Sequence, residues 1–237
     1  MHNMLTTREC ATLSRQCIAA AEAATSANSK DTASLQSQTP SLMRLPTFAA
    51  AQRANHTKTP FVAALPNDVS QAVDEALLRV AVALDRELPQ VVKELFVATG
   101  RNKNITLQQL LQASVTTQTQ NKQSSVVSPS SLQFASREPA VNVYRDGGEF
   151  LPHTDGQSLT LLLPITSQQQ GDYTGGGTAF WAPDTRGPRV TPPTVVIQPK
   201  AGTALLFGGT VMHAGMPVST GTRTVIVASF SIKQNTA

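Results

Sequence analysis

The chain changes from helical to strand-like patterning at Glu138, and this change limits its fold more than any other feature of the sequence. After Glu138 come short segments rich in β-branched and aromatic residues, separated by turn signals such as Asp146-Gly147-Gly148. Many short strands with glycine and proline turns are typical of a β-sandwich or jelly roll. The predicted strands are residues 140–145, 149–155, 158–165, 178–181, 194–198, 203–207 and 222–232.

The part before Glu138 has the periodicity of helices. Apolar residues recur every three or four positions over residues 67–88, where Asn67 or Asp68 can cap the start and Pro89 interrupts the pattern. Further helices are predicted over residues 6–24, 90–98 and 107–111. We therefore expect an α+β chain with a double-stranded β-helix (jelly-roll) core and N-terminal supporting helices.

Two stretches rich in Ser, Thr and Gln, residues 25–46 and 114–131, lack periodicity and predict loops. We expect residues 1–135 to form a helical support region that carries these loops, and residues 136–237 to form the jelly-roll core. A chain of 237 residues with this many strands fits one structural domain overall.

Charge and hydropathy argue against two classes of partner. The 19 Lys and Arg residues outnumber the 15 Asp and Glu residues, but the cations are scattered and form no stripe that would neutralise a phosphate backbone. No apolar run approaches the roughly 18 residues that span a bilayer. We expect no nucleic acid and no membrane as partner, which leaves a small-molecule or peptide substrate for the motifs below to support.

The two cysteines bear on the compartment. Cys10 and Cys17 lie in one predicted helix, about 10 Å apart along its axis, which is too far for a disulfide. Free thiols suit a reducing compartment, so a cytoplasmic location is favoured. The N-terminal segment lacks the basic and apolar regions of a secretory signal, and its richness in Ala, Ser and Thr leaves an organellar transit segment as the alternative.

Three side chains in the β half have the pattern of a metal site. His153 and Asp155 are two positions apart on a predicted strand, so they project from the same face. The other histidine of this half, His213, is the candidate third ligand. Two histidines and a carboxylate form the facial triad of non-haem Fe(II) oxygenases. Taken alone, a His-x-Asp pair on a strand is also typical of a surface pair or a structural histidine.

Arg223 enters an otherwise apolar strand ten positions after His213. A guanidinium that points into a barrel is costly unless it meets an anion, and its fork suits a carboxylate. Taken alone, Arg223 would instead be read as a solvent-facing edge residue.

Further motifs follow in order along the β half. They are a tyrosine, paired glycines and Pro-His-x-Asp within residues 144–155, Gly-Gly-x-Thr-x-Phe over 175–180, Pro-x-x-Gly within 199–207, and a closing His, Gly, Pro-Val, Gly and Arg over 213–223. Residues 5–10 also look like an entry helix. In this order the motifs resemble those of the Fe(II)/2-oxoglutarate-dependent dioxygenases, in particular the prolyl 4-hydroxylase-like branch.

The resemblance implies a cofactor set and a role for each candidate residue. His153, Asp155 and His213 would hold Fe(II), with 2-oxoglutarate as cosubstrate, O2 as oxidant and ascorbate as a further cofactor. Arg223 would pair with the distal carboxylate of 2-oxoglutarate. Tyr144 would donate its phenol to the same molecule.

The role of Tyr144 depends on local geometry. If Asp146-Gly147 forms a two-residue hairpin turn, Tyr144 falls opposite Glu149 and on the face of His153, whereas a three-residue turn reverses that parity. A core tyrosine that finds any acceptor is the competing interpretation.

The implied activity is hydroxylation of an unactivated C–H bond, in peptidyl proline or a small metabolite, coupled to oxidative decarboxylation of 2-oxoglutarate to succinate and CO2. Residues 160–165 are apolar where the branch commonly has a tyrosine, so the alternative is a non-catalytic metal- and 2-oxoglutarate-binding jelly roll. A zinc hydrolase is a weaker alternative because no nearby Glu or His provides a general base.

Two other activities of related enzymes are disfavoured by single residues. Halogenation needs the carboxylate position vacated for a halide, and Asp155 is present. Demethylation of nucleic acid is disfavoured because Ser229 stands where such relatives carry a second arginine.

Overall fold

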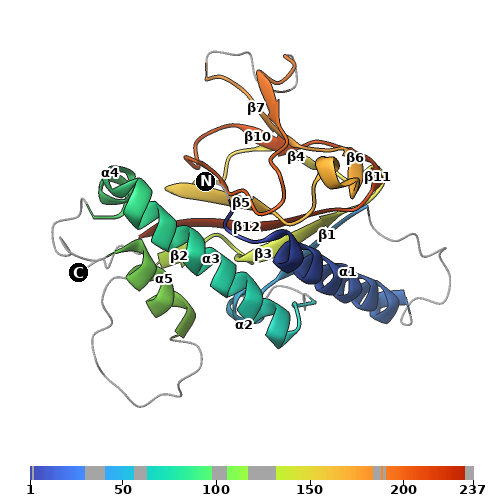
Figure 1. The fold of residues 1–237 in the computed structure, drawn as a ribbon, viewed down its shortest axis with the longest axis horizontal. Coiled ribbons are helices and arrows are strands. Elements are labelled where there is room, and N and C mark those ends of the chain that lie inside the picture. Colours follow the sequence, from blue (N-terminus) through green and yellow to red (C-terminus); the bar gives the residue numbers. More distant parts are fainter. Residues whose placement is uncertain are drawn as a thin grey trace.

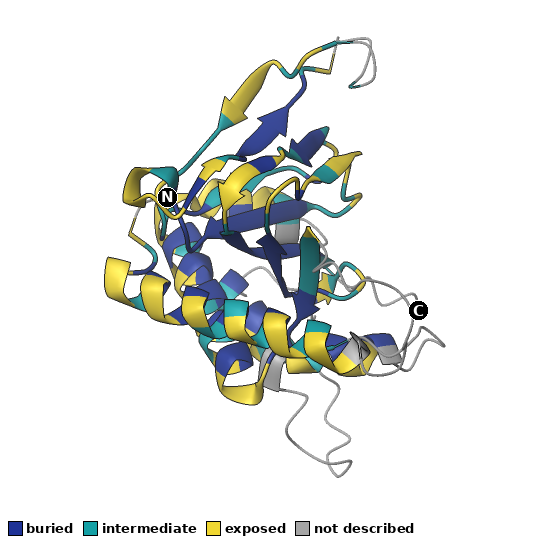
Figure 2. Ribbon diagram, turned by 90° about the vertical axis from the view of Figure 1, so that its right-hand side faces the viewer, coloured by how far each residue is buried: buried dark blue, intermediate teal, exposed yellow. Residues whose placement is uncertain are grey.

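The computed structural model describes residues 1, 3–29, 41–55, 63–97, 106–116, 132–183, 188 and 191–232. Within these residues, two antiparallel sheets face each other and helices cover the outer side of the larger one (Figure 1). Figure 2 shows the same arrangement by burial, with buried strands inside and helices whose exposed sides point outward. The α+β class and the jelly-roll core are therefore confirmed.

The last described strand, β12, lies in the middle of the larger sheet. The strand order of this sheet is β1-β3-β12-β5-β9, and β2 also pairs with β12. All of these pairs are antiparallel. The strands are β1 (Leu42–Pro46), β2 (Leu132–Phe134), β3 (Ala140–Tyr144), β5 (Leu159–Pro164), β9 (Leu205–Phe207) and β12 (Arg223–Ile232).

The smaller sheet has the order β4-β10-β7-β8, and β6 and β11 form a separate two-stranded ribbon. Their bounds are β4 (Phe150–His153), β6 (Tyr173–Gly175), β7 (Thr178–Phe180), β8 (Val195–Ile197), β10 (His213–Gly215) and β11 (Val218–Gly221). The two sheets supply opposite walls of one pocket, whose lining includes Asn142 and Leu162 from the larger sheet and His153 and Thr178 from the smaller.

The helical layer lies mostly in the N-terminal half of the chain. Its members are α1 (Thr7–Ser29), α2 (Phe48–Asn55), α3 (Asn67–Glu87), α4 (Pro89–Val92), the π-helical turn η1 (Lys93–Val97) and α5 (Leu107–Thr116), and a 3-10 turn, η2 (Gln168–Gln170), follows later. None of the helices in the described part has both the length and the apolar character that crossing a bilayer requires.

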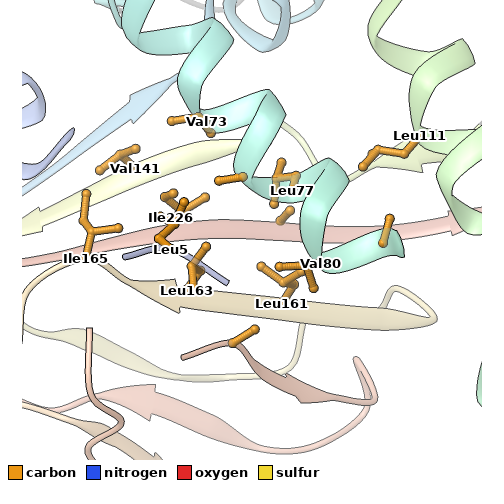
Figure 3. Packing of buried hydrophobic residues seen from close by; sticks show 14 of the residues in the cluster. Leu5, Val73, Leu77, Val80, Leu111, Val141, Leu161, Leu163, Ile165 and Ile226 are labelled. Carbon is orange, nitrogen blue, oxygen red and sulfur yellow. The ribbon is translucent and has the colours of Figure 1, made fainter. Parts of the chain in front are cut away.

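Helix α3 packs its apolar stripe on the larger sheet, as its periodicity predicts. Val73, Leu77 and Val80 are at most 2% exposed and lie over strand residues such as Leu163 and Ile226 (Figure 3). Full burial of an aliphatic side chain contributes roughly 1.5–3 kcal/mol, so this interface is a large share of what fixes the helices to the sheet.

The prediction of a loop over residues 25–46 is wrong at both ends. Residues 25–29 continue α1, and residues 42–46 form β1, which pairs in register with β3 from Leu42 opposite Tyr144 to Pro46 opposite Ala140. Pairing with a distant strand, rather than local periodicity, decides this segment, and Pro46 is tolerated because β1 is an edge strand. Residues 30–40 lie outside the described residues.

The second predicted loop, residues 114–131, begins inside a helix, because α5 runs to Thr116. Residues 117–131 lie outside the described residues. The division of the chain at residue 135 stays a prediction, to which the structure adds that β1 and β2, from the first part, belong to the larger sheet.

The two cysteines are buried free thiols in α1. Burial raises the pKa of Cys10 to about 11 and that of Cys17 to about 12. Both therefore serve as small apolar core residues, in line with the prediction that they form no disulfide.

Candidate active site

The structure brings His153, Asp155 and His213 together in one pocket between the two sheets. His153 ends β4, His213 begins β10, and the two residues are direct cross-strand partners. Each of the three side chains offers a ligand atom, and these atoms all lie within 4.8 Å of one another. His213 begins a separate strand, β10, which was not among the strands predicted from the sequence.

Both imidazoles are held by their own backbone. Nδ1 of His153 lies 2.8 Å from the carbonyl oxygen of Leu151, and Nδ1 of His213 lies 3.0 Å from that of Val211. A carbonyl only accepts, so each Nδ1 donates and each Nε2 is the nitrogen that faces Asp155. The Nε2 atoms lie 3.3 Å and 3.6 Å from the carboxylate oxygens of Asp155. This is the arrangement that orients histidine ligands toward a metal ion.

Hydrogen bonds to the carboxylate of Asp155 favour its charged form. Burial alone would raise the pKa of Asp155, but hydrogen bonds from His153 and from the hydroxyl of Thr160 bring it below its ordinary value. Burial lowers the pKa of His213. Burial also acts to lower the pKa of His153, but its bonds to Asp155 and Leu151 outweigh this effect and raise it. A divalent metal binds an ionised carboxylate and neutral imidazoles, so the lowered pKa values of Asp155 and His213 favour binding, and His153 would release its proton when an ion binds.

Arg223 is the buried cation of the pocket. It is 2% exposed at the start of β12, and its Nη2 donates to the hydroxyl of Thr178 at 3.1 Å. Its guanidinium carbon lies 4.9 Å from the centroid of the Tyr144 ring. Nη1 has no hydrogen-bond partner in the described part of the chain. Burial of a guanidinium with an unpaired donor is costly, and an anion such as a carboxylate would complete its hydrogen bonding. Arg223 is thus not a solvent-facing edge residue.

Tyr144 lines the same pocket, although the predicted reason was wrong. Strands β3 and β4 lie in different sheets, so residues 146–147 are no hairpin turn and Tyr144 does not face Glu149. Tyr144 is instead the cross-strand partner of Arg223, and its hydroxyl accepts a hydrogen bond from Nδ2 of Asn142 at 3.2 Å. The corrected register places the tyrosine beside the arginine.

Three further polar residues line the pocket that sequence reasoning missed: Asn142, Arg44 and Glu138. Asn142 is 3% exposed, and its Oδ1 has no partner among the described residues. Its signal in the sequence was an amide inside an apolar strand, two positions before Tyr144 and so on the same face. Arg44 gave no such signal because its strand was predicted as a loop.

The apolar strand 160–165 contributes Leu162 to the pocket wall. Polar groups near Arg223 come from other elements, namely Thr178 on the opposite sheet and the Asn142–Tyr144 pair on β3. Trp181 is not among the residues that line this pocket; it is 7% exposed, and its Nε1 donates to the carbonyl of Thr191 at 2.9 Å.

Comparison with solved structures returns proteins of low identity. A viral collagen prolyl hydroxylase from Paramecium bursaria Chlorella virus-1 is 15% identical, with 99% of this chain and 88% of that chain covered and a TM-score of 0.47. HygX from Streptomyces hygroscopicus, with nickel and 2-oxoglutarate bound, is 10% identical, with 98% and 81% covered and a TM-score of 0.47.

A third similar structure is an oxidoreductase of the 2OG-Fe(II) oxygenase family from Burkholderia pseudomallei. It is 18% identical with a TM-score of 0.33, and the match covers 43% of this chain and 44% of that one, so this chain spans less than half of it. At these identities and TM-scores, the solved structures carry no functional argument.

A search of curated proteins finds no significant match. The family model described as the 2OG-Fe(II) oxygenase superfamily matches residues 139–231. These residues contain the two imidazoles and the carboxylate that suit Fe(II), together with the arginine whose unpaired donor suits a dicarboxylate such as 2-oxoglutarate. Residues 139–231, which contain the three candidate metal ligands and Arg223, are thus similar to the 2OG-Fe(II) oxygenase superfamily.

Proposed function

We propose that the protein is an Fe(II)- and 2-oxoglutarate-dependent dioxygenase of the prolyl 4-hydroxylase-like branch. It hydroxylates an unactivated C–H bond, in peptidyl proline or a small metabolite, while 2-oxoglutarate is converted to succinate and CO2. The observation that carries this proposal is that the His153, Asp155 and His213 cluster shares one pocket with a buried arginine, Arg223, whose Nη1 has no hydrogen-bond partner among the described residues.

His153, Asp155 and His213 would hold the metal ion from one side and leave its other side to the pocket. The hydrogen bonds of both Nδ1 atoms to backbone carbonyls turn each Nε2 toward Asp155 and the position of the ion, so the rings need little reorientation on binding. When bound, Fe(II), 2-oxoglutarate and O2 supply the oxidising chemistry, and ascorbate is the proposed reductant that keeps the iron in its ferrous form.

Arg223 would bind the distal carboxylate of 2-oxoglutarate through its unpaired Nη1, with Thr178 fixing Nη2 and the phenol of Tyr144 within the same pocket. Leu162, Val225 and Val227 line the wall of the pocket and exclude water from it. The low dielectric of such a wall strengthens the pairing of the arginine with a carboxylate.

The test is an anaerobic titration of the purified protein with Fe(II) and 2-oxoglutarate, followed by the metal-to-ligand charge-transfer band in the visible. We expect the band in the wild type and a 2-oxoglutarate affinity about 10- to 100-fold weaker in Arg223→Ala, because a charge-assisted pair is lost. Arg145→Ala is the matched control, since Arg145 is a partly exposed arginine whose ion pair with Glu22 lies outside the pocket.

Two results would count against the proposal. Absence of the band in the wild type at any iron loading would show that the pocket does not bind 2-oxoglutarate together with Fe(II). A band without O2 consumption or succinate formation across candidate substrates would favour the non-catalytic metal- and 2-oxoglutarate-binding jelly roll, in which the apolar strand at Leu162 leaves the site able to bind but not to turn over.

A further inference from the structure

The pocket has a second cation, which the proposed chemistry does not use. Arg44 on β1 lines the pocket and donates from Nη2 to Oε1 of Glu138, another lining residue. Glu138 is 4% exposed, and its other oxygen accepts the backbone N–H of Ser229 on β12. Because the carboxylate is fixed by the sheet itself, it holds the guanidinium of Arg44 in one place.

The backbone of Arg44 is level with Asn142 and Val225, two positions after Arg223, but its guanidinium is held by Glu138, whose other oxygen bonds Ser229 at the metal end of the pocket. Ser229 comes six positions after Arg223 on the same strand, about 20 Å at the usual rise per residue. The hydroxyl of Thr160, the cross-strand partner of Ser229, bonds both Asp155 and Ser229. A 2-oxoglutarate molecule that reached from Arg223 to the metal ligands would therefore leave the Arg44–Glu138 end free.

Arg44 is also near the open side of the site. Its side chain is 24% exposed, and its guanidinium carbon lies 5.9 Å from the centroid of the Phe150 ring. The Phe150 ring in turn lies 4.6 Å from that of His153, the more exposed of the two histidines at 31%. The arginine thus reaches the part of the pocket where a substrate has to enter and lie beside the metal ligands.

The guanidinium of Arg44 has donors to spare. A guanidinium carries five N–H groups, and one bond to Glu138 is the hydrogen bond found for Arg44 within the described part of the chain. The remaining N–H groups form a planar fork of the kind that binds a carboxylate in two places. If the Arg44–Glu138 ion pair served only to connect β1 with β12, these two side chains would not need to line the pocket.

We infer that Arg44, held by Glu138, binds a carboxylate of the substrate, so the substrate is a small carboxylate-bearing molecule such as a free amino acid rather than the uncharged interior of a peptide. This inference rests on the proposed function, because it assigns the substrate end of the same site. Arg44 is then the residue that determines specificity, and Glu138 is a positioning residue that acts through it.

The experiment compares acids with their amides. Standard free L-amino acids, L-proline among them, and the matching carboxamides are titrated calorimetrically, without O2, into protein saturated with Fe(II) and 2-oxoglutarate. Succinate formation with each compound is then measured in air. The variants are Arg44→Ala, Arg44→Lys, which keeps a charge opposite Glu138 but loses the fork, and Arg79→Ala as a control for an exposed pair, Arg79–Glu9, on α3 and α1.

We expect at least one acid to bind the wild type more than tenfold tighter than its amide. Arg44→Ala should weaken the binding of that acid about 10- to 100-fold and leave the binding of the amide unchanged. Arg44→Lys should show an intermediate affinity for the acid, and Arg79→Ala should bind both compounds like the wild type. Far-UV circular dichroism and thermal unfolding show whether each variant is folded, and the control Arg79→Ala should keep the charge-transfer band and the slow succinate formation of the wild type.

The inference is overturned if acids and amides bind the wild type alike, if no acid binds, or if Arg44→Ala keeps the wild-type preference for the acid. The same titrations are run on metal-free protein. If the wild type lacks the charge-transfer band, the proposed function fails, and the comparison of acid with amide in the metal-free protein still decides the role of Arg44.

Discussion

At the scale of single residues, the ligand cluster owes its geometry to backbone atoms. The two histidines can be picked out of the sequence by their spacing from Asp155 and Arg223, but the carbonyls of Leu151 and Val211 that orient them cannot, because any residue supplies a carbonyl. What the sequence predicts here is which side chains meet. What it leaves open is the tautomer, and therefore which nitrogen faces the metal.

Asp155→Ala should abolish substrate-coupled succinate formation, with a fall of about 100-fold or more. The reason is that this carboxylate is the anionic member of the cluster, and even residues that only support a metal ligand cost 10- to 100-fold when changed. The measurement is succinate formed per minute at saturating Fe(II) and 2-oxoglutarate. Asp146→Ala, at an exposed carboxylate in the loop before β4, is the control, and equal activity in the two variants would contradict the assignment.

At the scale of elements, long helices and strands are predicted from the sequence more accurately than short ones. The long stripe of α3 predicts its helix nearly to the residue, whereas β6, β10 and β11 are three or four residues long and too short to show a period. β1 was missed because its evidence is non-local: the partner of Leu42 is Tyr144, about a hundred positions away. The same reason hid Arg44 from the candidate site.

The glycine-rich turn before β7 supports Arg223 through close packing. Gly176 has φ +64°, and a methyl group at its Cα would meet Cε2 of Tyr173 at 3.1 Å and Cδ of Arg223 at 3.2 Å. Gly176→Ala should therefore displace the arginine and weaken 2-oxoglutarate binding by about 3- to 10-fold. The readout is the concentration of 2-oxoglutarate that half-saturates the charge-transfer band.

Gly171→Ala is the matched control, because Gly171 also has a positive φ, +77°, but nothing lies within 4 Å of the added methyl group. Both substitutions carry the strain of a left-handed backbone, about 1–2 kcal/mol, so both should lower thermal stability. Equal weakening of 2-oxoglutarate binding in the two variants would mean that strain, rather than contact with Arg223, is the cause.

At the scale of the whole molecule, charged residues connect the helical layer with the pocket. Arg53 on α2 donates to the backbone carbonyl of Glu138 at 2.7 Å and lies 5.6 Å from the ring of Phe134. The positive charge of Arg53 is also close enough to Asp74 on α3 to influence the pKa of that carboxyl. Burial raises the pKa of Asp74 from its ordinary 3.8 to about 6, although Arg53 opposes the rise.

This raised pKa predicts a pH dependence of stability. A carboxyl that holds its proton more tightly when folded stabilises the protein below its unfolded pKa, and that contribution is lost as the pH rises through the folded value. From pH 4.5 to 7.5, the wild type should therefore lose about 1–2 kcal/mol of unfolding free energy relative to Asp74→Asn, after allowance for partial exposure.

The measurement is urea unfolding of the wild type and Asp74→Asn at both pH values. Glu75→Gln, at the next residue of the same helix but exposed, controls for a change of charge on α3. A gap between wild type and Asp74→Asn that stays the same at the two pH values would show that the carboxyl does not titrate in this range.

The position of β12 in the larger sheet also sets the order in which the protein can be completed during synthesis. β12 is the last described strand to leave the ribosome, yet it lies between β3 and β5 and bonds to both. Until residues 223–232 emerge, β3 and β5 each present an unpaired edge to the cell, and such edges recruit other chains. The nascent protein is thus open to aggregation from the emergence of β3 until that of β12, and a chaperone that covers strand edges would act on it at that stage.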